Sequence, residues 1–219
     1  MEVTGLVIFD MDGVIFDSER AFMEELRKVM REHGYVLTDD IYISTIGLTG
    51  EALKNKMQSF YGQDYPFKEI SSKARQRVSL LAEEGKIEVK KGIPQLLEFL
   101  RQKGKLCSVA SSTKSCYVDA YLRAAGIREY FKTITGGEEV ENSKPAPDIF
   151  IRACRKENIL PHEAIVIEDS PNGVRAALSA GIRVICIPDL AAPETALAEM
   201  AELVASDAFE AEKYLKDNM

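Results

Sequence analysis

Two aspartates separated by one residue, Asp10 and Asp12, directly follow an apolar stretch at residues 6–9. Four consecutive apolar residues are typical of a strand buried on both faces, and open α/β sheets bind their ligands where such strands end. Carboxylates this close repel one another unless a cation or a shared proton intervenes. The pair therefore fits a metal or proton-transfer site, and equally a solvated turn that ends at Gly13.

Three further polar clusters lie farther along the chain. Residues 111–113 (Ser-Ser-Thr) follow an apolar run and offer hydroxyls and backbone N–H groups to an anion, although a helix cap has the same composition. Lys144 stands before two prolines that stiffen a helix start, and by itself reads as an ordinary surface charge. Glu168 and Asp169 end an apolar strand, where an acidic pair is costly unless a metal or a partner compensates it. Carboxylate oxygens and a substrate phosphate are ligands that Mg²⁺ accepts.

The elements that must position these clusters alternate strictly from residue 105 onward. Such alternation is typical of a parallel sheet, whose strands end at one common edge. A weak strand and a polar helix complete the chain after residue 202. The patterns predict strands at 6–9, 105–110, 131–135, 164–168 and 183–187, and helices at 93–103, 114–125, 145–156, 171–180 and 193–202.

An inserted helical module accounts for the stretch between the first two strands. Roughly ninety residues separate Asp10 from Lys105, whereas a crossover between neighbouring parallel strands needs only about a dozen. Amphipathic runs at 22–30, 51–60 and 67–81 fill this stretch, without a convincing buried strand. We therefore expect an α/β core formed by 1–16 and 88–219, with a helical domain at 17–87.

Composition limits the class of protein and its partners. The 219 residues, 46% hydrophobic and 29% charged, can bury one core plus a smaller insert. A net charge of −7 disfavours nucleic acid or an anionic membrane as the main partner. Four cysteines without CxxC spacing suit a reducing compartment. With no signal-like N-terminus or membrane-length apolar run, we expect a cytoplasmic monomer or weak dimer.

The four clusters, in the order Asp-x-Asp, Ser, Lys and Glu-Asp, resemble the motif set of the haloacid dehalogenase-like (HAD) hydrolases. The resemblance covers essentially the whole chain. It is strongest for the subgroup with a helical cap after the first strand, near β-phosphoglucomutase and small sugar-phosphate and nucleotide phosphatases. It implies a three-layer, Rossmann-like parallel sheet with an inserted cap. It also implies a phosphatase that acts on a small phosphorylated metabolite, a sugar phosphate or a nucleotide-like compound.

The resemblance implies a role for each motif residue. Asp10 would be the nucleophile that becomes an aspartyl-phosphate, a known use of carboxylates. Asp12 would be the general acid for the leaving alkoxide and then the base for water. Ser111, with the N–H of Ser112, would bind the phosphoryl oxygens, and Lys144 would neutralise charge. The implied Mg²⁺ ligands are Asp10, Asp12 through its backbone carbonyl, Glu168 and Asp169.

Substrate choice is expected to lie in the cap. Thr49, Glu51 and Arg75 are candidate substrate-binding residues there. Lys73 and Arg77 are further candidates. Of the three basic side chains Lys73, Arg75 and Arg77, at least two are expected to lie on a solvated helix face.

Two other functions remain open. A mutase of the β-phosphoglucomutase type uses a histidine and an arginine where this chain has Phe22 and Gly50. The loss of that arginine removes a bidentate phosphate ligand and favours a phosphatase. A phospho-receiver or phosphate-sensing module would also combine acidic, hydroxyl and lysine side chains. It would carry its phosphorylated aspartate after the third strand and have no helical insert.

Overall fold

The computed structural model describes residues 5–46, 48, 50–190 and 195–218. The chain divides into two compact units, Met1–Asp17 with Glu88–Met219, and Ser18–Ile87. We call them the core unit and the helical unit and describe each by itself. None of the helices in the described part of the chain combines the length and apolar character that a membrane span requires.

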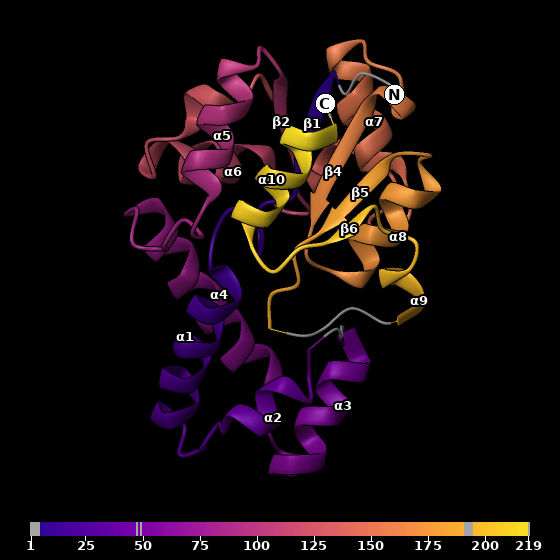
Figure 1. The fold of residues 1–219 in the computed structure, drawn as a ribbon. Helices are drawn as coiled ribbons and strands as arrows, with labels where there is room; N and C mark the ends of the chain where they lie inside the picture. Colours follow the sequence, from indigo (N-terminus) through magenta and orange to yellow (C-terminus); the bar gives the residue numbers. More distant parts are fainter. Residues whose placement is uncertain (1–4, 47, 49, 191–194, 219) are drawn as a thin grey trace. The chain divides into compact units, whose positions relative to one another are not determined.

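The core unit is built on a six-stranded parallel sheet in the order β3-β2-β1-β4-β5-β6 (Figure 1). Every pairing is parallel, so all the strands end at the same edge of the sheet. The strands are β1 (Leu6–Phe9), β2 (Leu106–Ala110), β3 (Thr133–Thr135), β4 (Ala164–Glu168), β5 (Arg183–Cys186) and β6 (Leu203–Val204).

The central strand β1 is apolar because both of its faces are covered. All four of its residues are fully buried. Leu6 and Ile8 join a hydrophobic cluster with Phe150 and Val174 on one face. Successive side chains of a strand alternate between faces, and Phe9 meets the ring of Phe131 edge to face at 5.7 Å.

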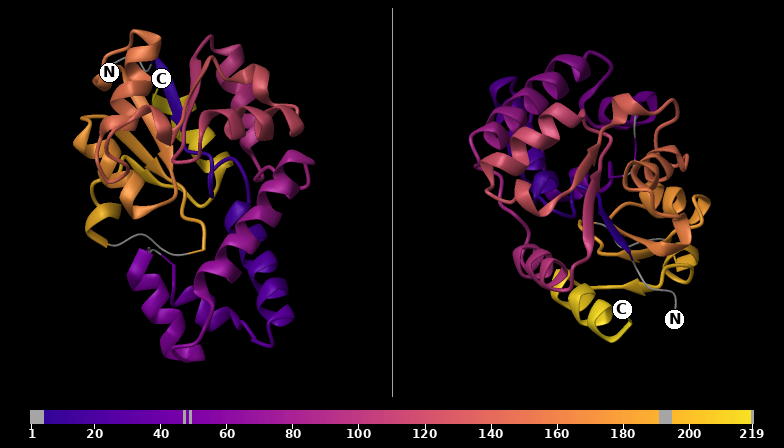
Figure 2. Two further views of the ribbon diagram at one scale, coloured as in Figure 1. Left: turned by 180° about the vertical axis from the view of Figure 1, so that it is seen from behind. Right: turned by 90° about the horizontal axis from the view of Figure 1, so that it is seen from above.

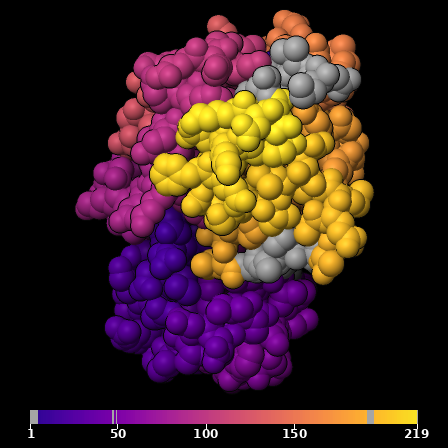
Figure 3. Space-filling model, viewed as in Figure 1, coloured from indigo at the N-terminus to yellow at the C-terminus, as the bar shows by residue number. Residues whose placement is uncertain are grey.

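Helices cover both faces of the sheet (Figure 2). α7 and α8 contribute to the cluster around Leu6 and Ile8, whereas α5 packs on β2 and α10 packs on α5. α10 lies at the surface beside α5 (Figure 3), where the Lys216 ammonium stands 5.2 Å from the Phe99 ring centre. The helices are α5 (Ile93–Gln102), α6 (Ser115–Ala124), α7 (Asp148–Glu157), α8 (Pro171–Ser179), α9 (Thr195–Ala198) and α10 (Ala208–Asn218), with 3-10 turns at Arg128–Tyr130, Gly137–Glu139 and Pro161–Glu163.

The helical unit contains α1 (Ser18–Glu32), α2 (Asp39–Ile43), α3 (Gly50–Tyr61) and α4 (Phe67–Glu83). α1 packs along α4. Glu32 on α1 pairs with Lys73 and Arg77 on α4 at 2.8 and 2.7 Å. These two basic side chains, considered above as cap-lining candidates, are therefore engaged within the helical unit.

Two chain segments pair where the core unit leads into and out of the insert. The N–H of Asp17 donates to the carbonyl of Glu88 at 3.0 Å, and the N–H of Lys90 donates to that of Ile15 at 2.8 Å. Phe16 and Val89 form an antiparallel bridge between them. Residues 15–17 and 88–90 thus form a short double linker that belongs to the core unit.

The expected fold class, an α/β parallel sheet with an inserted helical module, is confirmed. The predicted strands lie within a few residues of the observed ones, and the four cysteines are free. The short helix α2 was not predicted, because a single turn leaves little periodicity in the sequence. The helix expected at 193–202 is confined to α9 among the described residues, and its predicted start at Pro193 lies outside them.

Candidate active site

A cluster of three carboxylates lies at the carboxyl edge of the sheet. Oxygen atoms of Asp10, Glu168 and Asp169 lie within 4.8 Å of one another. The register explains this convergence: Phe9 pairs with Ile167, and the N–H of Asp10 donates to the Ile167 carbonyl at 2.9 Å. Three hard oxygen donors at this spacing fit a divalent cation such as Mg²⁺ or Ca²⁺.

Lys144 supplies a positive charge to this cluster. Its ammonium contacts Asp10 Oδ1 and donates to Glu168 Oε1 at 2.7 Å and to the Ala110 carbonyl at 3.3 Å. Only 8% of the side chain is exposed. Burial opposes its charge, but the carboxylates of Asp10 and Glu168 outweigh burial and raise the pKa of Lys144. Lys144 therefore stays an ammonium beside Asp10.

Glu168 is held in place from two sides. Its Oε2 accepts from the N–H groups of Asp169 and Ser170, both at 2.8 Å, and from the Ser170 hydroxyl at 3.0 Å. A Cβ on Gly173, in the first turn of α8, would lie 1.6 Å from Glu168 Oε1. Glycine at this position thus lets the helix start pack directly on the carboxylate that anchors Lys144.

The electrostatics of the cluster reflect crowding of like charges. Burial, followed by the charges of Glu168 and Asp12, raises the pKa of Asp10 to about 7 despite the opposing ammonium of Lys144. Burial and then Glu168 also raise the pKa of Asp169 well above its ordinary value. Without a cation, the site resists full ionisation at neutral pH, and a bound divalent cation would relieve that repulsion.

A second group of polar side chains flanks Asp10. Ser111, 1% exposed at the end of β2, accepts at Oγ from the N–H of Thr113 at 3.1 Å. The Thr113 hydroxyl donates to Asp12 Oδ2 at 3.3 Å. Ser112 is exposed, and a Cβ on Gly137 would lie 2.3 Å from its carbonyl oxygen. The sequence placed Thr113 in an anion-binding cluster, but nothing in it signalled the contact with Asp12.

The predicted substrate-binding residues of the insert belong to the helical unit. Thr49 lies outside the described residues. Glu51 is exposed and pairs with Lys54 one turn along α3 at 3.1 Å, and Arg75 is exposed on α4. Their contact with a substrate stays a prediction.

The arrangement is typical of an α/β enzyme: an acidic cluster that fits a divalent cation lies with a buried lysine at the carboxyl edge of a parallel sheet. The chain belongs to the haloacid dehalogenase-like hydrolases, whose family pattern matches residues 7–187.

Individual relatives agree with this membership. The phosphorylated carbohydrates phosphatase of Thermotoga maritima is 34% identical, over 80% of this chain and 81% of the relative. A structure of a candidate β-phosphoglucomutase from the same organism is 30% identical with a TM-score of 0.79, and covers 98% of this chain and 99% of the other. CbbY from Rhodobacter sphaeroides, solved with phosphate and with xylulose-(1,5)-bisphosphate, is 28% identical with a TM-score of 0.74, over 95% of this chain and 96% of CbbY. The resemblance inferred from the motifs and the enzyme class, a HAD-like phosphatase, are both confirmed.

The packing of Gly173 on Glu168 predicts that Gly173→Ala destabilises the core unit. Alanine favours a helix by up to about 1 kcal/mol over glycine, but the added methyl displaces a buried carboxylate, and overpacking costs about 1–3 kcal/mol. Urea unfolding of the metal-free protein should show a net loss of stability. Asn172→Ala, an exposed change in the same turn, should leave it nearly unchanged. Equal stability of Gly173→Ala and wild type would contradict this account of the packing.

The raised pKa of Asp10 predicts that Asp10→Asn stabilises the metal-free protein at high pH. Because the folded-state pKa of about 7 exceeds the ordinary 3.8, the folded wild type binds more protons than the unfolded chain between these values. Its stability therefore falls as pH rises through that window. Unfolding in EDTA should show the variant more stable by about 1–4 kcal/mol above pH 7, with the difference vanishing near pH 4. A difference that does not change with pH would refute the assignment.

Proposed function

We propose that this protein is a magnesium-dependent phosphomonoester hydrolase that acts on a small phosphorylated metabolite through an aspartyl-phosphate at Asp10. The observation that carries the proposal is the shared position of Asp10. Its carboxylate contacts the buried ammonium of Lys144, and it also lies close enough to the carboxylates of Glu168 and Asp169 for all three to bind one cation. Phosphoryl transfer depends mainly on alignment and charge neutralisation, and this cluster can supply both.

The first step is attack by Asp10 on phosphorus. A bond forms between a carboxylate oxygen of Asp10 and phosphorus while the bond from phosphorus to the leaving oxygen breaks. The ammonium of Lys144 favours the ionised form of Asp10 against the effect of burial, and it offsets charge on the phosphoryl oxygens. Asp10, Asp169 and the backbone carbonyl of Asp12, with support from Glu168, would hold Mg²⁺, which would supply the remaining charge neutralisation.

Asp12 completes both steps as acid and then base. It donates a proton to the leaving alkoxide, and afterwards accepts one from the water that attacks the aspartyl-phosphate and frees Asp10 and inorganic phosphate. The hydroxyl of Thr113, 3.3 Å from Asp12 Oδ2, orients this carboxyl group. Ser111, with the N–H of Ser112, binds the phosphoryl oxygens at the end of β2.

The substrate class follows from the relatives rather than from the core unit. One relative is named for phosphorylated carbohydrates, and CbbY was solved with a phosphorylated sugar. We infer that this chain also takes a sugar phosphate or a similar small phosphoester. The helical unit would select among such compounds, with Thr49, Glu51 and Arg75 as the first residues to vary.

The nucleophile is tested with p-nitrophenyl phosphate. Asp10→Asn should lower kcat by at least about 10³-fold, because removal of a nucleophile disables the whole catalytic unit. EDTA should abolish wild-type activity, and added Mg²⁺ should restore it. Asp217→Asn, the same change at an exposed position on α10, should have no effect. Comparable turnover by Asp10→Asn would refute the aspartyl-phosphate mechanism, and full activity in EDTA would refute the metal requirement.

A phosphosugar mutase is the second candidate, favoured by the similar structure of a candidate β-phosphoglucomutase. A mutase must hold a second phosphate, and glycine at position 50 has no side chain to bind it. With glucose 1-phosphate and Mg²⁺, ³¹P NMR should therefore show inorganic phosphate and no glucose 6-phosphate. Accumulation of glucose 6-phosphate would reverse the choice between the two functions.

A further inference from the structure

Lys90 joins three segments of the core unit that are far apart in the sequence. Its ammonium donates to the carbonyl of Gly13 at 2.7 Å and pairs with Asp189 Oδ1 at 2.7 Å. Gly13 belongs to the loop that follows Asp12, Lys90 to the linker that leaves the insert, and Asp189 to the segment after β5. One side chain thus ties the catalytic loop to two other parts of the core unit.

The loop held by Lys90 touches the acidic cluster directly. Gly13 has a φ of +78°, and a Cβ built on it would lie 2.3 Å from Asp169 Oδ2. The backbone at Gly13 therefore packs against a carboxylate proposed to hold Mg²⁺. The adjoining peptide carries the carbonyl of Asp12, so movement of Gly13 would disturb both groups.

The ion pair between Lys90 and Asp189 is largely buried. The side chains of Asp189 and Lys90 are only 10% and 22% exposed. Asp189 Oδ2 is buried and has no hydrogen-bond partner among the described residues. A carboxylate in this position depends on its ammonium partner, because a buried charge that loses its partner is strongly unfavourable.

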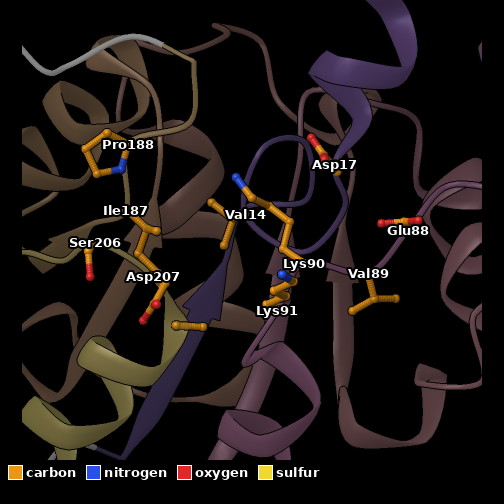
Figure 4. A pocket seen from close by; sticks show the side chains of 11 residues that line it. Val14, Asp17, Glu88, Val89, Lys90, Lys91, Ile187, Pro188, Ser206 and Asp207 are labelled. Atoms are coloured by element: carbon orange, nitrogen blue, oxygen red, sulfur yellow. The ribbon is translucent and has the colours of Figure 1, made fainter.

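A pocket of about 220 Å³ opens beside Lys90 (Figure 4). Lys91, Val14 and Ile187 share its lining with Lys90. This space lets side chains of similar length replace Lys90 without overpacking. Lys91 is exposed, and within the described part of the chain its side chain has no hydrogen bond or ion pair, so it offers a matched control in the same pocket.

We propose that Lys90, held by Asp189, is a positioning residue for the cation site. It fixes the Gly13 carbonyl, and through it the Asp12–Gly13 peptide, against Asp169. The inference rests on the phosphatase function proposed above. It adds to that function a residue pair outside the four motifs.

The experiment must separate the effect of Lys90 on the position of the Gly13 backbone from the effect of its charge on Mg²⁺ binding. Lys90→Met removes a positive charge, which by itself would strengthen Mg²⁺ binding, whereas Asp189→Asn would by itself weaken it. The double variant Lys90→Met with Asp189→Asn keeps the net local charge of the wild type and removes the contacts of Lys90 with Gly13 and Asp189. Lys90→Arg keeps both the charge and the donors.

Two measurements read out the proposal. The Mg²⁺-induced rise in Tm reports metal binding without turnover, and p-nitrophenyl phosphate hydrolysis at saturating Mg²⁺ gives kcat and KM separately. In the double variant, the Mg²⁺ concentration for half of the Tm rise should increase by roughly 10- to 100-fold, as for other residues that orient metal ligands. Its kcat should fall with KM little changed. Lys90→Arg should keep most of the affinity, and Lys91→Met, which removes a charge but no contact, should not weaken Mg²⁺ binding.

The outcomes distinguish this inference from the function on which it rests. A double variant that binds Mg²⁺ and turns over like the wild type would overturn the positioning role and leave the phosphatase intact. A wild type whose Tm does not respond to Mg²⁺ would instead refute the metal-dependent function. Should the double variant fail to fold, Lys90→Arg and Lys90→Gln decide: similar impairment of both would overturn the proposal, and better retention by arginine would support it.

Discussion

The repulsion between buried carboxylates is the constraint on which the candidate active site depends. Asp10, Glu168 and Asp169 bring three carboxylates together, and one ammonium, that of Lys144, lies among them. With all four groups ionised, two negative charges stay uncompensated, which a single divalent cation would balance. Burial, and then the charges of the neighbouring carboxylates, raise the pKa values of Asp10 and Asp169, and the carboxylates of Asp10 and Glu168 raise the pKa of Lys144 against the effect of burial. The protein resists ionisation of its own carboxylates until a cation is present.

The parallel sheet makes this crowding possible and sustains it. Because β2 and β4 flank β1, the residues that follow these three strands lie close together at one edge of the sheet. No long loop is needed to bring them together. The apolar side chains of the strands form a continuous core. Burial of this core supplies the free energy that holds the polar groups at the sheet edge together despite their repulsion. Backbone N–H groups at the start of α8 then fix Glu168, and Gly173 lets that helix approach closely.

The sequence predicted those parts of the structure that depend on short patterns. Apolar runs located the strands, and the rule that parallel strands share an edge predicted that Asp10 and Glu168 would meet. Contacts that depend on the path of one side chain across the fold left no such pattern. The bond from Lys90 to Gly13 spans 77 residues and its pair with Asp189 spans 99. Likewise, the pairing of Lys73 and Arg77 with Glu32 depends on how α1 meets α4, which periodicity alone does not determine.

The charges of the helical unit bear on whether the protein hydrolyses a phosphosugar or moves its phosphate to another position, as a mutase does. A mutase must release a bisphosphate and bind it again in the opposite orientation, so it needs a strong second phosphate site in its insert. Two of the three basic residues considered as substrate-binding candidates in the insert, Lys73 and Arg77, are engaged with Glu32 within the helical unit. Transfer of either side chain to a phosphate would leave that carboxylate without its partner. With glycine at position 50 and Arg75 as the remaining one of these three basic residues, we expect the insert to hold a second phosphate weakly, which fits the hydrolase proposed above better than a mutase.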